Sequence, residues 1–376
     1  MTDARVGYEE DPGASRRGEE PDEGYRAAVT AAAIVDRPPR TLLTVSGRAP
    51  GRMLQGVVTG TLPPEPEEGE GGLLRGRMHY SAILTPKGRL VSDLRLARLG
   101  NGEQGALLMD LPGEGTDSAL EHLRKYLPPR FAQVESPDPR FELLSVVGPR
   151  APELIAREVL GERMDPELLE ALAEGEERVL SGEEGPGVRV VRNRDVRPPA
   201  FDVIAPSPTL EPIRTRLELA GARPAGAPVW ETLRLEKGRP AYGYELDEAT
   251  LPPEAGIVDR AVDHMKGCYT GQEVIVRIRD RGRVNRRLRG ILLGEVPPPE
   301  AGTPLFHPSR EASAGETRST AESPRFGQAI ALAYLRREVD PPARVRIGSP
   351  TGPEVEVRAL DDEAGWILEE GDPGRN

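Results

Sequence analysis

The sequence predicts an α+β fold that is followed by a small all-β domain. Short strand-like runs alternate with short helices up to about residue 284, and from residue 285 the pattern is of strands alone. The length of 376 residues and the hydrophobic content of 37% suit two or three domains with cores of their own. We therefore expect an α+β region over 25–284 and a β-barrel over 285–360.

The individual elements follow from apolar runs that Gly, Pro or charged residues bound. In the first region, strands are predicted to begin at Thr41, Ser81, Leu90, Gly105 and Phe141. Helical spacing at 120, 123 and 127, with Asp117 as a possible cap, predicts one helix, and spacing at 155 and 159 predicts another between Pro152 and Gly161. In the second region, runs beginning at Arg286, Gln328 and Ala343 are separated by turns and suit a barrel. The polar stretch 307–324 predicts a long loop.

Both ends of the chain are expected to lie outside these domains. Residues 1–24 are acidic, rich in Gly and Pro and without hydrophobic periodicity, as in a disordered tail. Residues 361–376 are similar, although Trp366, Ile367 and Leu368 could dock weakly. No apolar stretch approaches the roughly 20 residues that span a bilayer, and the start lacks the apolar core of a signal peptide. A cytoplasmic location without membrane contact is therefore expected.

Charge and cysteine content exclude some classes of function. A formal net charge of −12 counts against direct binding of nucleic acid, because phosphate backbones would repel the molecule. The single cysteine, Cys268, excludes an internal disulfide framework. One thiolate also cannot supply the four ligands of an ordinary iron–sulfur cluster, so we expect no resident metal site.

The segment KGCYTGQE, from Lys266 to Glu273, is hereafter the cysteine segment. Glycines on both sides of Cys268 leave the backbone bare, so its thiol can be exposed, and Lys266 would favour the reactive thiolate. A small buried hydrophobe at a turn is the alternative, because free cysteine is often buried. His264 could act as a base for the thiol if the intervening turn were helical.

The cysteine segment and four other stretches together resemble the YgfZ-type branch of the T-protein superfamily. The other stretches are VSGRAPGRMLQG from Val45, LTPKGRLVSDLRL from Leu84, LRLEKGRPAYGYELDE from Leu233 and SPRFGQAIALAYLRRE from Ser323. The resemblance covers roughly residues 25 to 350. It implies a folate-binding fold of two ferredoxin-like subdomains with a C-terminal β-barrel.

The cysteine segment also distinguishes two branches of that superfamily. The T-protein branch has a similar segment in which a lysine, an aromatic residue, a glycine and a glutamate recur. They match Lys266, Tyr269, Gly271 and Glu273 of this sequence. The T-protein segment lacks the cysteine, so Cys268 is what favours the YgfZ-type branch.

A tetrahydrofolate site is implied by the same resemblance. A flat apolar pterin, an edge that suits a carboxylate and a glutamate tail that suits arginine define what such a site needs. The resemblance places Asp93 near the reacting folate nitrogen, Asp202 at the pterin edge and Arg234 close to the ligand. Tyr126 and Tyr242 are weaker candidates for stacking on the ring. The alternative is that both aspartates are ordinary edge-strand carboxylates and that Arg234 is a helix-surface residue paired with a nearby acid.

Two departures from the T-protein pattern bear on activity. Gly60 and Thr61 stand where that branch has an Asn and Asp pair, and Ser92 precedes Asp93 where it has two adjacent acids. One acid of the second pair survives. The pattern therefore favours folate binding over aminomethyl transfer.

Three functions follow from these observations. The resemblance implies a tetrahydrofolate-binding accessory protein that supports iron–sulfur cluster assembly or repair, and through it tRNA modification. Cys268 would then be a redox or transient ligand residue, and the partners would be assembly or client proteins. One alternative is a tetrahydrofolate-dependent aminomethyltransferase or demethylase that uses Asp93. The other is a non-catalytic interaction module, which the missing Asn and Asp pair favours, so catalysis itself stays open.

Seven arginines lie between Arg277 and Arg289. Because Val274, Val276 and Ile278 alternate before them, this stretch predicts a β-hairpin that turns near Gly282. A solvated hairpin is the simpler interpretation. The other is a positive surface near Cys268 that attracts an anionic ligand tail or an acidic partner. No aromatic residues are interleaved to stack RNA bases.

Overall fold

The computed structural model describes residues 22–181, 187–361, 365–370 and 372–374. The tail predicted over 1–24 therefore lies, up to residue 21, outside the described residues, and helix α1 (Glu23–Thr30) follows it directly. Within the described part, no helix combines the length and the apolar character that a membrane crossing requires.

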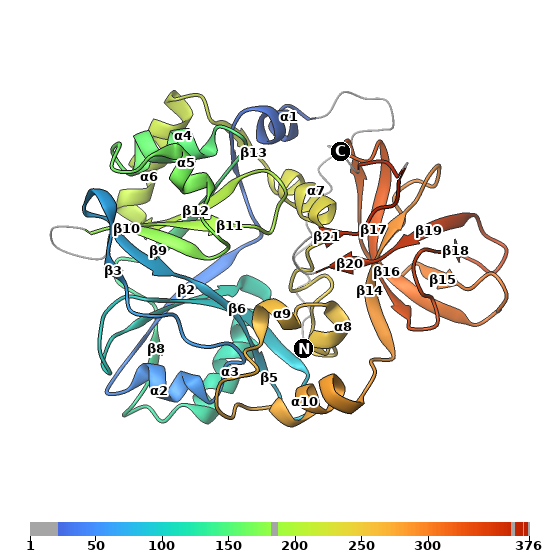
Figure 1. Ribbon diagram of the computed structural model, residues 1–376, viewed down its shortest axis with the longest axis horizontal. Coiled ribbons are helices and arrows are strands. Elements are labelled where there is room, and N and C mark those ends of the chain that lie inside the picture. The colour runs from blue at the N-terminus through green and yellow to red at the C-terminus, as the bar shows by residue number, and fades with distance from the viewer. Residues whose placement is uncertain (1–21, 182–186, 362–364, 371, 375–376) are drawn as a thin grey trace, which may run out of the picture.

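The first part of the α+β region is a five-stranded antiparallel sheet in the order β5-β6-β7-β2-β8 (Figure 1). The strands are β2 (Arg40–Ser46), β5 (His79–Leu84), β6 (Leu90–Arg98), β7 (Leu107–Pro112) and β8 (Gln133–Glu135). Two helices, α2 (Pro50–Gln55) and α3 (Thr116–Tyr126), belong to this part. Leu94 and Leu96 of β6 and Leu123 of α3 share one core on one face of the sheet.

The second part is an eight-stranded sheet in the order β13-β1-β9-β12-β11-β10-β4-β3. Its strands are β1 (Ala33–Val35), β3 (Glu67–Glu68), β4 (Leu74–Arg77), β9 (Phe141–Val147), β10 (Glu176–Leu180), β11 (Val188–Asn193), β12 (Ala200–Pro206) and β13 (Arg223–Ala225). Its helical elements include α4 (Ala151–Leu154), the π-turn Ile155–Val159, α5 (Pro166–Glu170) and α6 (Ser207–Leu219). A small apolar cluster that includes Leu42, Leu108 and Ile204 joins the two sheets.

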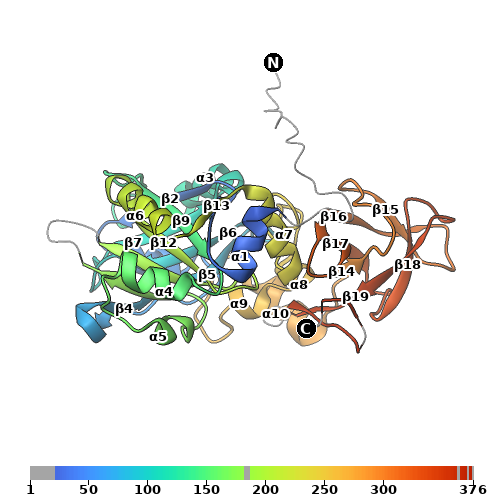
Figure 2. The same ribbon diagram turned by 90° about the horizontal axis from the view of Figure 1, so that it is seen from above.

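Four helices lie between the two sheets and the C-terminal domain (Figure 2). They are α7 (Ala227–Lys237), α8 (Pro252–Ala255), α9 (Val258–Ala261) and α10 (Gln272–Arg281). The C-terminal domain is a closed barrel in the order β14-β17-β16-β15-β18-β19. Its strands are β14 (Arg286–Leu292), β15 (Pro304–Phe306), β16 (Ser313–Ser323), β17 (Gln328–Arg336), β18 (Ala343–Ile347) and β19 (Glu354–Arg358). The predicted α+β fold with a terminal β-barrel is thus confirmed.

The loop predicted over 307–324 is wrong, because most of it is strand β16. Polar residues usually indicate a solvent-exposed loop, but here their hydrogen bonds are made to distant parts of the chain. The Thr317 hydroxyl donates to Glu300 O (2.8 Å) and the Ser323 hydroxyl donates to the Glu236 carboxylate (2.5 Å). Pairing with β15 and β17 on both sides completes the backbone hydrogen bonds.

The hairpin predicted over 277–289 is also wrong. Its first part is the end of helix α10, and its last part is the start of β14. Gly271, with φ of 84°, precedes the helix, and Ile275 is its buried residue. The alternation of Val274, Val276 and Ile278 indicated a strand, but Gln, Glu and Arg are good helix formers and the helix packs beside α8.

The C-terminal stretch contributes more than a weak contact. Strands β20 (Leu360–Asp361) and β21 (Gly365–Trp366) pair with each other. Trp366 is buried, and its Nε1 donates to Leu235 O of α7 (2.8 Å). Its ring lies 4.9 Å from that of Phe326. This tryptophan therefore helps to hold the barrel against α7.

Candidate functional site

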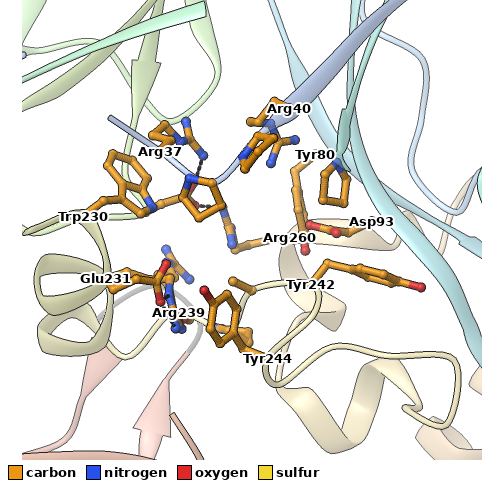
Figure 3. Close-up of a pocket in the computed structure, with 17 residues that line it drawn as sticks. Arg37, Arg40, Tyr80, Asp93, Trp230, Glu231, Arg239, Tyr242, Tyr244 and Arg260 are labelled. Carbon is orange, nitrogen blue, oxygen red and sulfur yellow. Dashed lines mark hydrogen bonds and ion pairs between the residues drawn. The ribbon is translucent and has the colours of Figure 1, made fainter. Parts of the chain in front are cut away.

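A cavity lies where the two sheets, α7 and the 239–244 loop meet. Figure 3 shows charged and aromatic side chains that surround this space from several elements. We call it the central cavity. The charged and aromatic residues of its wall are Arg37, Arg40, Tyr80, Asp93, Asp195, Trp230, Glu231, Arg234, Arg239, Tyr242, Tyr244 and Arg260.

Asp93 lines the central cavity from strand β6. Leu94 and Leu96 face the core of the first sheet, so the alternation of a strand turns Asp93 to the other face. Asp93 is buried, and none of the described residues forms a hydrogen bond with its Oδ1. Burial raises the pKa of Asp93, although Arg40 and a hydrogen bond from Tyr80 act in the opposite direction.

Asp202 lies behind the wall of the central cavity rather than in it. It is fully buried on β12, and its Oδ2 accepts from Arg37 (2.9 Å), Arg95 (2.6 Å) and Asn193 (3.0 Å). Its Oδ1 accepts from Ser145 (2.7 Å). Burial acts to raise the pKa of Asp202, but Arg37, Arg95 and these hydrogen bonds bring it down to about 2. Asp202 therefore acts on the cavity only indirectly, because it holds the side chain of Arg37 in the wall.

Arg234 lines the cavity from α7, and only 2% of its surface is exposed. Its guanidinium pairs with Glu231 (2.6 Å) and Glu245 (3.0 Å), and also donates to Ser319 of the barrel (3.2 Å). Burial acts to lower the pKa of Arg234, but Glu245 and Glu231 outweigh burial and raise it. Arg234 is thus a buried anchor that joins the cavity wall to the barrel.

The two predicted tyrosines lie in different places. Tyr242 lines the cavity, and its hydroxyl donates to Val91 O (2.8 Å). Tyr126 does not belong to the cavity wall. It ends α3 and packs against the core of the first sheet, with its ring 4.5 Å from that of His122.

Several residues of the wall were not predicted. Arg37 lies over the Trp230 ring (4.1 Å), and Arg260 lies over the Tyr80 ring (4.4 Å). Asp195 accepts from Arg260 (3.0 Å) and pairs with Arg37 (3.6 Å). The stretch DRPPR over 36–40 carries a signal, because two prolines flanked by arginines directly precede a strand. Tyr80 and Arg260 carry no local signal, since only the fold brings them together.

The cysteine segment lies apart from this cavity, because none of its residues is in the wall. Cys268 is exposed. The Lys266 ammonium donates to Val58 O (2.6 Å) and Gly60 O (2.9 Å), and it lies 5.5 Å from the Tyr269 ring centre. Burial lowers the pKa of Lys266 to about 8, with Asp263 acting in the opposite direction.

Neither neighbour of the thiol forms the contact that the sequence suggested. Among the described residues, no hydrogen bond or ion pair joins Cys268 to Lys266 or to His264. Next to the carbonyl of Gly60, the Thr61 hydroxyl donates to the Asp263 carboxylate. Gly60 and Thr61 therefore hold residues 263–266 beside the first sheet.

Comparisons with known proteins agree with this architecture. Residues 14–266 match the model of the GCVT N-terminal domain, and residues 286–362 match that of the glycine cleavage T-protein C-terminal barrel domain. An aminomethyltransferase of Rubrobacter xylanophilus is 31% identical over 266 residues, covering 70% of this chain and 68% of the relative. An aminomethyltransferase of Thermus thermophilus is 28% identical over 283 residues, covering 74% of each.

A solved structure has the same fold. The crystal structure of glycine cleavage system aminomethyltransferase T from Bartonella henselae matches with a TM-score of 0.73 and 17% identity. The match covers 92% of this chain and 90% of that one. Aminomethyltransferases of this family use tetrahydrofolate, which agrees with the ligand that the resemblance implies. With both domain models matched in order, this chain belongs to the GCVT family of the T-protein superfamily.

Proposed function

We propose that this protein binds tetrahydrofolate in the central cavity and catalyses a tetrahydrofolate-dependent one-carbon transfer, with aminomethyl transfer as the first reaction to test. The observation that carries this proposal is the buried Asp93 carboxylate, whose Oδ1 has no partner in the part of the chain that the structure describes. A buried polar atom without a partner costs free energy unless a ligand satisfies it. A folate nitrogen that gains or loses a proton would be such a partner.

Asp93 would act as the acid–base group of the transfer. Burial raises the pKa of Asp93, which brings its titration closer to neutral pH. A carboxyl group of this kind can hold a proton, pass it to a leaving amine and take one back from the folate nitrogen. Asp202 cannot share that task, because four side chains already bind its two oxygens.

The rest of the cavity wall suits the other parts of tetrahydrofolate. Tyr80, Trp230, Tyr242 and Tyr244 offer aromatic faces for the pterin and aminobenzoyl rings. The wall also holds five arginines and three acids, and each of these arginines has an ion-pair partner, so their guanidinium groups are held in place where the carboxylates of the tail could bind. The arginines are Arg37, Arg40, Arg234, Arg239 and Arg260, and the acids are Asp93, Asp195 and Glu231. Ion pairs fix much of this wall in advance, so binding requires little ordering of side chains.

Calorimetric titration with tetrahydrofolate tests binding, and formation of methylene-tetrahydrofolate from an aminomethyl-loaded carrier protein tests transfer. We expect micromolar binding by the intact protein. We expect Asp93→Asn to reduce turnover about 100-fold or more while binding persists, because proton transfer typically contributes that much. Asp117→Asn, which changes an exposed acid on α3, is the matched control.

Two results would contradict the proposal at different levels. Binding without turnover by the intact protein would remove the transferase and leave a folate-binding accessory protein. Absence of binding would remove both and leave a non-catalytic interaction module.

A second candidate function is that of a folate-binding accessory factor of the YgfZ type, which supports iron–sulfur cluster assembly or repair. The exposed Cys268 favours it, because its thiol lies outside the central cavity and a partner protein can reach it. A deletion strain that carries Cys268→Ala tests this function. We expect the variant to bind tetrahydrofolate with unchanged affinity but not to restore the activity of iron–sulfur enzymes. Full recovery of that activity would contradict this second function.

A further inference from the structure

A second cavity adjoins the central cavity. Its wall combines residues 238–240 after α7, residues 253–256 at α8, residues 287–289 of β14 and residues 360–361 of β20. Arg239 and Pro240 line both cavities, so a single stretch of chain separates them. The second cavity lies where the α+β region meets the barrel.

Arg289 is the unusual residue in this wall. Seven arginines are buried in the described part of the chain, and six have a hydrogen-bond or ion-pair partner there. The six are Arg95, Arg189, Arg192, Arg234, Arg239 and Arg358. Arg289 is 9% exposed, yet no hydrogen bond or ion pair joins it to any described residue.

The Arg289 guanidinium is partly desolvated and has no counter-charge within hydrogen-bond distance among the described residues. A buried charge is normally paired, because its desolvation otherwise goes uncompensated. Burial and the neighbouring Arg287 lower the pKa of Arg289, while Asp340 acts in the opposite direction. A ligand that brings negative charge would compensate for this desolvation.

The other charges of the second cavity leave a positive excess. Arg287 lies on the same face of β14 as Arg289, and Arg239 adds a third guanidinium. Two acids, Glu254 and Asp361, also line the cavity. The Glu254 carboxylate already accepts from Arg286, at 3.0 Å, which lies outside the wall.

We propose that the second cavity binds an oxyanion, a carboxylate or phosphate group, with Arg289 as its central ligand and Arg287 beside it. Two sources supply this chemistry. One is a free anion such as inorganic phosphate. The other is the chain of γ-linked glutamates on a folate, reaching past Arg239 from the central cavity, and this source rests on the proposed function.

Titrations on the full-length protein test the site. The ligands are inorganic phosphate, tetrahydrofolate monoglutamate and tetrahydrofolate triglutamate, and the variants are Arg289→Gln and Arg289→Lys. Arg336→Gln is the matched control, because Arg336 is exposed on the neighbouring strand β17. We expect Arg289→Gln to fold with an unchanged or higher Tm and to lose anion affinity about 10- to 100-fold, since hydrogen bonds to charged groups are worth that much. Arg289→Lys should retain part of the affinity.

The arms of this experiment separate the two sources. Phosphate that binds and raises the Tm of the intact protein and the control, but not of Arg289→Gln, identifies a free anion. A triglutamate that binds at least tenfold more tightly than the monoglutamate, with the advantage lost in Arg289→Gln, identifies the glutamyl chain.

Failure of the site is distinct from failure of the proposed function. If the monoglutamate does not bind, the proposed function fails. The phosphate titration then still shows whether the second cavity binds an oxyanion. The oxyanion site is overturned if Arg289→Gln responds to phosphate and to the triglutamate as the intact protein does. It is also overturned if this variant loses several degrees of Tm in the absence of any anion, which would make Arg289 a structural residue.

Discussion

The central cavity and the cysteine segment are assembled in opposite ways. The cavity takes its charged residues from stretches that lie far apart in the chain, and acids hold most of its arginines in place. The cysteine segment is a single run of eight residues, Lys266 to Glu273. Its lysine turns inward to two backbone carbonyls, while its cysteine is exposed.

This difference separates two kinds of chemistry. In the proposed function, prearranged ion pairs would let the cavity bind a charged ligand without reorganising its wall. The Cys268 thiol is exposed, so molecules in the solvent can reach it directly. Substitutions in the cavity wall should therefore cost stability or catalysis, whereas substitution of the thiol should cost neither.

The largest effect is expected from Arg234→Met. The change leaves Glu245 buried without its arginine, so we expect the free energy of unfolding to fall by about 3–5 kcal/mol. Urea denaturation measures it. Arg336→Met, an exposed control, should stay within about 0.5 kcal/mol. A loss below about 1 kcal/mol for Arg234→Met would show that the ion pair does not organise the wall.

Asp93 of the first sheet and Asp202 of the second sheet should respond to pH with opposite signs. The folded-state pKa of Asp202 is lowered to about 2, so its stabilisation is present above the unfolded pKa and is lost as pH falls toward 2. Asp202→Asn should therefore cost about 2–3 kcal/mol at neutral pH. The pKa of Asp93 is raised, so its contribution is present below the unfolded pKa and is lost as pH rises through the folded pKa.

It follows that Asp93→Asn should be at least as stable as the intact protein at neutral pH. Its advantage should disappear as pH falls toward about 4, the unfolded pKa of a carboxyl group. Unfolding curves of Asp93→Asn, Asp202→Asn and the intact protein, recorded between about pH 4 and pH 7, test both predictions. If both substitutions shifted the free energy of unfolding in the same direction at neutral pH, the expected difference between Asp93, with a free oxygen, and the fully paired Asp202 would be contradicted.

A smaller loss is expected from Lys266→Met. Two carbonyls lose their donor, so we expect the free energy of unfolding to fall by about 1–3 kcal/mol. Because the pKa of Lys266 is lowered to about 8, the unfolded chain binds more protons than the folded one between that pH and its ordinary pKa. Stability of the intact protein relative to the variant should therefore rise across this range. A constant difference would mean that Lys266 titrates normally.

The smallest effect on stability is expected from Cys268→Ala, within about 0.5 kcal/mol, because the side chain is exposed. In the native protein, the thiol should react with a disulfide reagent as fast as it does in urea, with and without tetrahydrofolate. Strong protection by folate would place the thiol at the cavity after all and would remove the contrast between the two regions.

The sequence predicted well where the pattern was local. The alternation of apolar residues in 90–98 placed β6, and the same alternation turns Asp93 away from the core of the first sheet. It failed where an alternation was accidental, as at Val274, Val276 and Ile278 of α10, or where polar residues were satisfied by distant partners, as in β16.

By itself, the sequence determined the α+β fold, the terminal barrel and three residues that line the central cavity, namely Asp93, Arg234 and Tyr242. Only the tertiary structure decided that Asp202 serves the wall from behind and that Lys266 binds carbonyls instead of its neighbouring thiol. The contacts responsible join residues 107 and 208 positions apart, from Arg95 to Asp202 and from Lys266 to Val58. Periodicity reports which face a residue occupies, whereas the partner it finds there depends on packing between distant segments.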